Sequence, residues 1–344
     1  MTTDRLRVIF DADIGPDPTD FTTISMLHEY HERGMIELVA TIGETPDPLL
    51  ASTFAVYNRL HGHDVPIGAP IDGGRDLTFE ERGRVAYDLT MQVVTRRNQN
   101  EVIAERYGDP STTDRAVPTP VECYRRLLAA SSQPDITIYA AGQLFNLTAL
   151  LDSPPDEHSP LSGEDLVRRS LKALHFMGGA FPSSVDELEP GIANVTGGAE
   201  WNFWALNMRG VTATALDRLS ALGIPMTFVG WEVGIRVLAG REIIERLGRQ
   251  HPSPEAYFQY VSTSEDGTEL TNENPAYDDV ALFHLVEGDT GSWFGEVRGR
   301  PVIDDVGVNT WAEDGPDRYI TLQPGVEAEL AALVTDRITG RFDA

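Results

Sequence analysis

The chain has 344 residues, of which 41% are hydrophobic, and a formal net charge of −27. This composition can bury a sizeable core and excludes a disordered or collagen-like polymer. The excess of 54 acidic over 27 basic residues argues against nucleic acid and against an anionic membrane surface as partners, because phosphate contacts need clustered Lys and Arg.

Several reactive chemistries are also restricted by residue usage. Lys172 is the only lysine, so a Schiff base would have one candidate, and Cys123 is the only cysteine, which excludes an internal disulfide and an all-cysteine zinc site. No apolar signal-peptide core precedes the first strand, and the longest apolar stretch, 136–151, is too short to cross a bilayer. We therefore expect a soluble, cytoplasmic protein.

Strand-like and helix-like patterns alternate along most of the chain. Strands are predicted at 6–10, 36–42, 136–141, 173–177 and 225–229, and the helices that follow the first two at 19–32 and 49–61. Each later strand is also followed by a helix signal. This alternation predicts βαβ units, and so an α/β fold with an open, mainly parallel sheet flanked by helices.

The remaining segments complete a single domain spanning 1–344. Residues 72–115 are charged and weakly periodic, which predicts a peripheral helical or loop segment that could cover a site. Residues 302–308 and 318–322 alternate as antiparallel edge strands do, and 325–338 reads as a closing helix.

An acidic cluster follows the first strand directly. Asp11, Asp13, Asp17 and Asp20 lie within ten residues. Crowded carboxylates repel one another and lose hydration, so such a cluster usually persists because a cation compensates it, and oxygen-only ligation suits calcium or magnesium, not zinc. The alternative is that Asp17 and Thr19 cap the helix and Asp11 accepts backbone hydrogen bonds.

Two families place acidic motifs after a first strand. Phosphatases of the haloacid dehalogenase class need a later lysine and a second acidic motif, whereas here Gly15 and Pro16 follow the motif and Lys172 stands alone. The segment Asp11-Ala12-Asp13-Ile14-Gly15 instead resembles the opening motif of calcium-dependent nucleoside hydrolases of the inosine/uridine-preferring type, with two extra residues before the paired aspartates. The resemblance covers most of the chain and implies a Rossmann-like core.

The resemblance assigns roles within the opening motif. Asp13 is similar to the residue that both contacts calcium and acts as general base, and Asp20 resembles the bidentate calcium ligand. Thr19 stands where the family has an aspartate that binds a ribose hydroxyl, so a weaker hydrogen bond to that hydroxyl is expected.

Two later segments extend the resemblance. Ala140 to Leu147 is similar to an element in which the residue at the position of Phe145 offers its backbone carbonyl to calcium. A Met-Gly-Gly turn at 177–179, followed by Asn and by Glu-x-Asn, resembles the element that holds the sugar. It implies that Met177 lines the sugar pocket and that ribose hydroxyls are bound by Asn194, Glu200 and Asn202.

The last matching segment begins at Pro275. Asp278 takes the place of the last protein ligand of calcium. Tyr277 stands where many relatives have the histidine that protonates the leaving group, and its ordinary pKa near 10 makes it a weaker acid at neutral pH. An N-cap role for Asp278 and Asp279 is the alternative.

Histidine pairs give a weaker signal. His28 and His31 lie three residues apart on the first predicted helix, and His61 and His63 follow the second. Each pair could chelate a metal, but no third soft ligand is evident, so core or surface roles are favoured. Trp231 and Glu232 follow a strand and could reach the pocket or form a structural turn.

Taken together, the resemblance implies a hydrolase that cleaves the N-glycosidic bond of a ribonucleoside with a calcium-bound water, in purine or pyrimidine salvage, as a homodimer or homotetramer. Three alternatives remain: a non-catalytic ribose- or nucleoside-binding homologue, an enzyme redirected to a modified nucleoside, and a metal-dependent phosphatase.

Overall fold

The computed structural model describes residues 5–15, 17–45, 47, 49–70, 99–108, 117–181, 199–203, 210–261, 273–288, 292–305 and 307–342. Every structural statement below concerns these residues. Asn194 and most of the segment 72–115 lie outside them.

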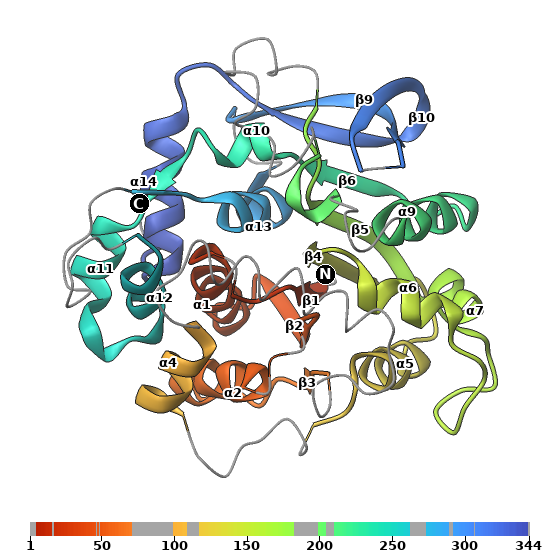
Figure 1. Ribbon diagram of the computed structural model, residues 1–344, viewed down its shortest axis with the longest axis horizontal. Coiled ribbons are helices and arrows are strands. Elements are labelled where there is room, and N and C mark those ends of the chain that lie inside the picture. Colours follow the sequence, from red (N-terminus) through yellow and green to blue (C-terminus); the bar gives the residue numbers. More distant parts are fainter. Residues whose placement is uncertain are drawn as a thin grey trace.

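An eight-stranded sheet forms the centre of the chain (Figure 1), in the order β3-β2-β1-β4-β5-β6-β10-β9. Its strands are β1 (Leu6–Ala12), β2 (Ile36–Gly43), β3 (Ile67–Gly68), β4 (Ile136–Ala141), β5 (Leu171–Met177), β6 (Met226–Val229), β9 (Phe294–Ile303) and β10 (Asn309–Leu322). All neighbours pair in parallel except β9 and β10, which are antiparallel. The carboxyl ends of the parallel strands therefore share one edge, where ligands bind in such sheets.

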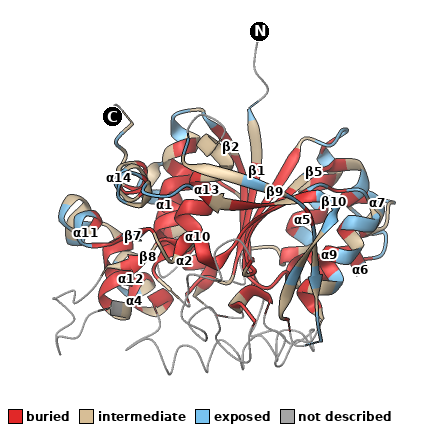
Figure 2. Cartoon of the chain, turned by 90° about the horizontal axis from the view of Figure 1, so that it is seen from above, coloured by how far each residue is buried: buried red, intermediate tan, exposed pale blue. Residues whose placement is uncertain are grey.

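Helices cover both faces of this sheet (Figure 2). On β1, Val8 and Phe10 pack into one hydrophobic cluster and Ile9 into the other, so the strand is apolar on both sides. One face carries α1 (Thr19–Glu32), α2 (Leu50–His61), α13 (Tyr277–Glu287) and α14 (Glu327–Ile338), and the other α5 (Pro120–Ala130), α6 (Phe145–Asp152), α7 (Gly163–Ser170) and α9 (Val211–Ala221).

Shorter elements flank the first of these layers. They are α4 (Gln99–Tyr107), α10 (Trp231–Gly234), α11 (Arg241–Leu247), α12 (Pro252–Val261) and the two-stranded pair of β7 (Leu238–Ala239) and β8 (Asn274–Pro275). Helix α4 is the described part of the segment 72–115, and it lies beside α2 and α12 in Figure 1. No helix among the described residues is long and apolar enough to cross a membrane.

The sequence predictions hold for most elements and fail at the carboxyl end. The predicted helix 19–32 coincides with α1, and the predicted strand 136–141 with β4. The predicted strand 302–308 is wrong: β9 ends at Ile303, and the described residues of 304–308 belong to the turn before β10. The closing helix starts at Glu327 because Gly325 is in the left-handed region, with φ of 81°.

Candidate metal and sugar site

Three carboxylates from distant parts of the chain meet at the start of α1. Oxygen atoms of Asp17, Asp20 and Asp278 all lie within 4.8 Å of one another. The turn after β1 supplies Asp17, the first turn of α1 supplies Asp20, and the first turn of α13 supplies Asp278. The hydroxyl of Thr19 lies between them, 2.5 Å from Asp17 Oδ1 and 3.0 Å from Asp278 Oδ2.

Asp20 and Asp278 are buried, Asp17 is half-buried, and the described residues place no basic side chain against Asp20 or Asp278. Burial raises the pKa of Asp20 and of Asp278 well above the usual carboxyl range, and the charges of the neighbouring carboxylates raise both further. Among the described residues, no Lys or Arg side chain lowers the pKa of either. Because all the donor atoms are oxygens, the group could hold a hard divalent cation.

Asp13 lies beside this group but is not one of its three members. Its Oδ2 accepts a hydrogen bond of 2.9 Å from Trp201 Nε1. Burial raises the pKa of Asp13 to about 7, with a further contribution from the charge of Asp17, while the bond from Trp201 opposes the shift. A carboxyl that titrates near neutral pH can take a proton from water.

Asp17, for which a helix-capping role was the alternative, also belongs to the carboxylate group. Its Oδ1 accepts the backbone N–H of Thr19, the first residue of α1, at 2.7 Å, although the N-cap residue of the helix is Pro18, and the same side chain is a member of the carboxylate group. The structure thus adds Asp17 to the predicted metal ligands.

Two further carboxylates support the site. Asp11 accepts hydrogen bonds from Tyr124 Oη at 2.7 Å and Asn146 Nδ2 at 2.8 Å, so its partners are side chains and not the backbone groups expected for it. Glu44, at the carboxyl end of β2, accepts the backbone N–H of Gln143 at 2.7 Å. Sequence reasoning missed Glu44; the available signal was a carboxylate directly after a buried strand.

The turn between β4 and α6 approaches this carboxylate closely. A Cβ atom at Gly142 would lie 2.5 Å from Glu44 Oε2, so only glycine fits there. Leu144 then adopts φ of 56°, in the left-handed region, and Phe145 begins α6. That the Phe145 carbonyl binds a metal stays a prediction.

Three of the predicted sugar-binding residues, Met177, Glu200 and Asn202, lie together at the carboxyl end of β5. Asn202 Nδ2 donates to the Met177 carbonyl at 2.8 Å, whereas Asn202 Oδ1 is buried without a hydrogen-bond partner. Glu200 Oε2 accepts the backbone N–H groups of Gly179, at 2.8 Å, and Asn202, at 3.0 Å. Burial raises the pKa of Glu200 to about 7. The unpartnered Asn202 oxygen is free to accept a hydrogen bond from a ligand hydroxyl.

Two residues outside the segments that resemble the nucleoside hydrolases, Asn309 and Glu232, hold the chain directly after the Met-Gly-Gly turn at 177–179 in place. Asn309, the first residue of β10, exchanges two hydrogen bonds with the backbone of Ala180, at 2.9 and 2.8 Å. Glu232 Oε2 accepts the Phe181 N–H at 3.1 Å, and burial raises the pKa of Glu232 to about 8. Glu232 therefore forms part of a structural turn, one of the two roles expected of it.

Comparison with known proteins points to one group of enzymes. No family model matches the chain. The chain is 26% identical over 245 residues to the pyrimidine-specific ribonucleoside hydrolase RihA of Citrobacter koseri, covering 70% of this chain and 65% of that protein, and 26% identical to RihA of Shewanella woodyi, covering 64% of it. The match thus spans just under two thirds of the length of these curated relatives.

Solved structures of the same kind match over nearly the whole chain. An inosine-uridine preferring nucleoside hydrolase of Bacillus anthracis matches with a TM-score of 0.60 at 14% identity, covering 96% of this chain and 99% of that one. The plant nucleoside hydrolase PpNRh1 matches with a TM-score of 0.64 at 16% identity, covering 97% and 98%. The chain is thus similar in sequence to ribonucleoside hydrolases and has the fold of solved nucleoside hydrolases. The α/β fold and the family resemblance inferred from the sequence are both confirmed.

Among the described residues, Thr19 and Tyr277 are the main departures from the motifs of the nucleoside hydrolases that the sequence resembles. Tyr277 is the first residue of α13 and packs against α10, where a Cβ at Gly234 would lie 2.5 Å from Tyr277 Cδ1. Burial raises the pKa of Tyr277 further above its usual value. The phenol therefore stays protonated; its oxygen accepts a hydrogen bond from Trp231, which opposes the rise in pKa, and its own proton is available to a ligand.

Proposed function

We propose that the chain hydrolyses the N-glycosidic bond of a ribonucleoside, giving free base and ribose. The observation that carries this proposal is the buried, uncompensated group of Asp17, Asp20 and Asp278 beside Asp13, at the carboxyl edge of the sheet. The relatives named ribonucleoside hydrolases support it.

We propose calcium as the cofactor of this site. The donors fit, because Asp13, Asp17, Asp20 and Asp278 offer only oxygen atoms, to which the Phe145 carbonyl would add another. When bound, the ion offsets the carboxylate charge and lowers the pKa of a bound water.

The chain's own residues then account for the proton transfers. Asp13 takes a proton from the attacking water, whose oxygen forms a bond to the sugar C1′ as the C1′–N bond breaks. The departing base keeps the bonding electron pair and takes up a proton, for which the Tyr277 hydroxyl is the proposed donor. Asn202 Oδ1 accepts a hydrogen bond from a ribose hydroxyl, and Glu200 holds the turn that carries it. Met177, Asn194 and Thr19 are the remaining proposed sugar contacts.

The test is release of free base from uridine, cytidine, inosine and adenosine, measured by chromatography with calcium and with a chelator. We expect calcium-dependent release that Asp13→Asn abolishes, while the exposed control Asp165→Asn leaves it unchanged. Intact nucleosides under all conditions would overturn the proposal. Base release from a modified nucleoside alone would identify the redirected enzyme. Hydrolysis of a phosphate ester with magnesium would identify the phosphatase.

A second candidate function is binding of a ribose-containing ligand without turnover. Two contacts favour it: Trp201 occupies an oxygen of Asp13, and the hydroxyl of Thr19 is already engaged by two carboxylates. A structural neighbour, the type III effector XopQ, is complexed with adenosine diphosphate ribose; it matches with a TM-score of 0.61 at 16% identity. Calorimetric binding of adenosine diphosphate ribose with no base release would select this candidate.

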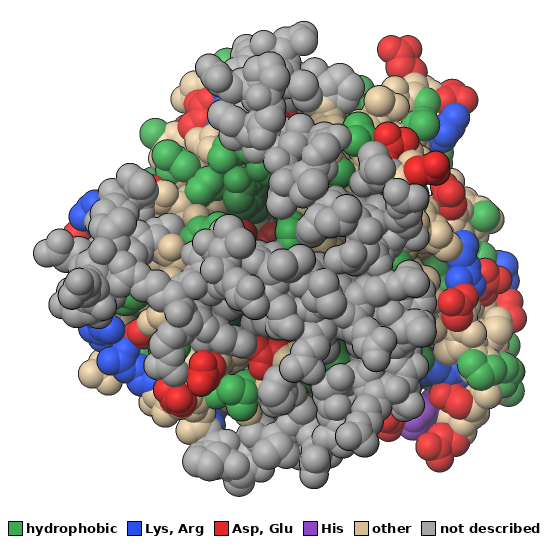
Figure 3. Space-filling model, viewed as in Figure 1, with side chains coloured by type: hydrophobic (Ala, Val, Ile, Leu, Met, Phe, Trp, Pro, Cys, Tyr) green, Lys and Arg blue, Asp and Glu red, His purple; other side chains and the backbone are tan. Residues whose placement is uncertain are grey.

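The wider context belongs to the same proposal. We infer a single domain over 1–344, a cytoplasmic location, a role in nucleoside salvage and a homodimer or homotetramer. Acidic and basic side chains lie interspersed on the described part of the face in Figure 3, which suits a small uncharged ligand. Size-exclusion chromatography with light scattering tests the oligomeric state.

A further inference from the structure

Four of the chain's eight histidines meet at the far end of α1 from the carboxylate group. The ring of His28 stacks on that of His61 with centroids 5.0 Å apart, and on that of His63 at 5.2 Å, while His31 meets His63 edge-on at 4.8 Å. Helix α1 supplies His28 and His31. The end of α2 and the left-handed turn at Gly62 supply the others.

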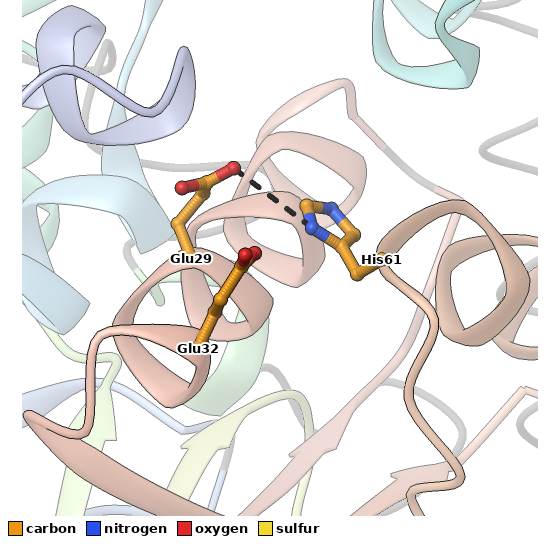
Figure 4. A group of neighbouring side chains, drawn as sticks. All are labelled: Glu29, Glu32 and His61. Atoms are coloured by element: carbon orange, nitrogen blue, oxygen red, sulfur yellow. Dashed lines mark ion pairs between the residues drawn. The ribbon is translucent and has the colours of Figure 1, made fainter.

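Two glutamates of α1 converge on this histidine cluster. Ligand atoms of Glu29, Glu32 and His61 all lie within 4.8 Å of one another (Figure 4). Glu29 Oε1 is 3.8 Å from His61 Nδ1, which is too long for a hydrogen bond. Two ligands bound to one ion at 2.0–2.1 Å in tetrahedral geometry lie roughly 3.3 Å apart, so a small side-chain rotation would suit a shared ion.

The imidazoles in this cluster have unused nitrogen atoms. The side chain of His61 is 8% exposed and that of His28 is fully buried, and Nε2 of each lacks a hydrogen-bond partner among the described residues, while the other nitrogen of His61, Nδ1, is the one that faces Glu29. His28 Nδ1 lies 2.9 Å from His63 Nδ1, and this bond holds the His28 ring against His61. Buried polar atoms without partners are uncommon, and a bound water or an ion is the usual explanation for them.

The nearest basic group leaves the ligand atoms accessible. Arg33 Nε lies 3.7 Å from Glu29 Oε2, the oxygen that does not face His61, and Arg33 also donates to the Gly340 carbonyl. Glu32 is exposed, so an ion could enter from solvent.

We propose that Glu29, Glu32 and His61 form a second metal site, which binds a divalent transition-metal ion of the zinc class. One imidazole and two carboxylates suit zinc better than calcium, which prefers oxygen ligands alone. Glu32 follows Asp20 by twelve residues of α1, which corresponds to about 18 Å along the helix. The site is therefore distinct from the proposed catalytic one, ties the end of α1 to the end of α2, and does not rest on the proposed function.

The experiment measures Zn²⁺ binding to the full chain after chelator treatment, by competition with a chromophoric chelator and by the absorption spectrum of Co²⁺. We expect a site that Asp20→Asn retains. Glu32→Gln, an exposed substitution that leaves the core intact, and His61→Ala should each weaken it roughly 100-fold, because even residues behind the ligands change metal affinity 10- to 100-fold.

A matched control is available at His158, whose Nε2 faces Glu122 Oε1 at 3.9 Å. That pair has nearly the same separation as His61 and Glu29 but is not part of a three-residue group among the described residues. His158→Ala should leave zinc affinity unchanged. The proposal is overturned if zinc does not bind, or if Glu32→Gln binds zinc as tightly as the unsubstituted chain.

Discussion

The two ends of α1 carry acidic side chains in contrasting surroundings. At its start, Asp20 is buried with other carboxylates and a threonine hydroxyl, and the possible ligand atoms of the group are all oxygens. At its last turn, Glu29 and Glu32 are partly or fully exposed and face imidazole nitrogens. The same helix thus presents buried oxygen ligands at its start and accessible oxygen and nitrogen ligands at its end. The two sites should therefore differ in which divalent ion they bind, although the ions carry the same charge.

The largest expected effect comes from substitution at the buried end. Asp20→Asn removes a charged ligand, and we expect kcat/KM to fall at least about 100-fold and calcium binding to weaken in parallel. Without calcium the same variant should unfold at a higher temperature, because one of several mutually repelling carboxylates is gone. Calorimetry and thermal melts with and without calcium check this. An unchanged calcium affinity would place the ion elsewhere.

Proton linkage should also distinguish the two ends. Burial raises the pKa of Asp13 to about 7 and that of Asp278 well above the usual carboxyl range, so binding of the proposed calcium ion should displace a proton from Asp13 near neutral pH. The calcium affinity should then fall about tenfold for each unit by which the pH is lowered, for each proton released. The pKa of His61 is lowered to about 4, so zinc affinity should be nearly constant between pH 6.5 and 8. Titrations in buffers of different ionisation enthalpy measure both.

A smaller effect is expected from the unpartnered amide oxygen near the buried end. Asn202→Ala should raise KM about tenfold, the value of one hydrogen bond of roughly 1.4 kcal/mol. Asn58→Ala is the matched control, because Asn58 Nδ2 also donates to a backbone carbonyl, that of Val65 at 2.8 Å, and its Oδ1 is also unpartnered. Equal KM changes in both variants would mean that stability, and not sugar binding, is affected.

The smallest effect concerns a histidine that belongs to neither end. Burial lowers the pKa of His175 well below its usual value, and its Nε2 donates to the Ala281 carbonyl. Its contribution to stability is therefore complete above the unfolded pKa near 6.5 and decreases by about 1.4 kcal/mol per pH unit below it. Urea unfolding at pH 7.5 and 5.5 should show a smaller acid loss for His175→Gln than for the unsubstituted chain.

Local patterns were enough to predict most of the fold. The helix α1 and the strand β4 follow from apolar periodicity alone, since both are long enough for the pattern to be read. The carboxyl-terminal hairpin was misplaced because alternation does not mark where a turn begins. The sequence pattern also did not predict which strands pair, since β10 pairs in parallel with β6 and antiparallel with β9.

The site was predictable only where a residue lay in a motif. Asp13, Asp20 and Asp278 were identified through the family resemblance, whereas Glu44 and Asn309 act through contacts across the chain that no local spacing encodes. Asp17 shows most clearly what local patterns miss. Its hydrogen bond with Thr19 is local in sequence, whereas its proximity to Asp278 depends on the complete fold. The histidine pairs were likewise read separately, although the fold stacks them.

The hydrogen bond between Thr19 and Asp278 joins residues 259 positions apart. Such a contact closes only after most of the chain has left the ribosome, and closing so long a loop costs entropy that later packing must offset. A nascent or truncated chain can form β1 and α1 without assembling the full set of carboxylates. Affinity for the proposed calcium ion should therefore measure completed folding, and loss of that ion should be an early signal of unfolding.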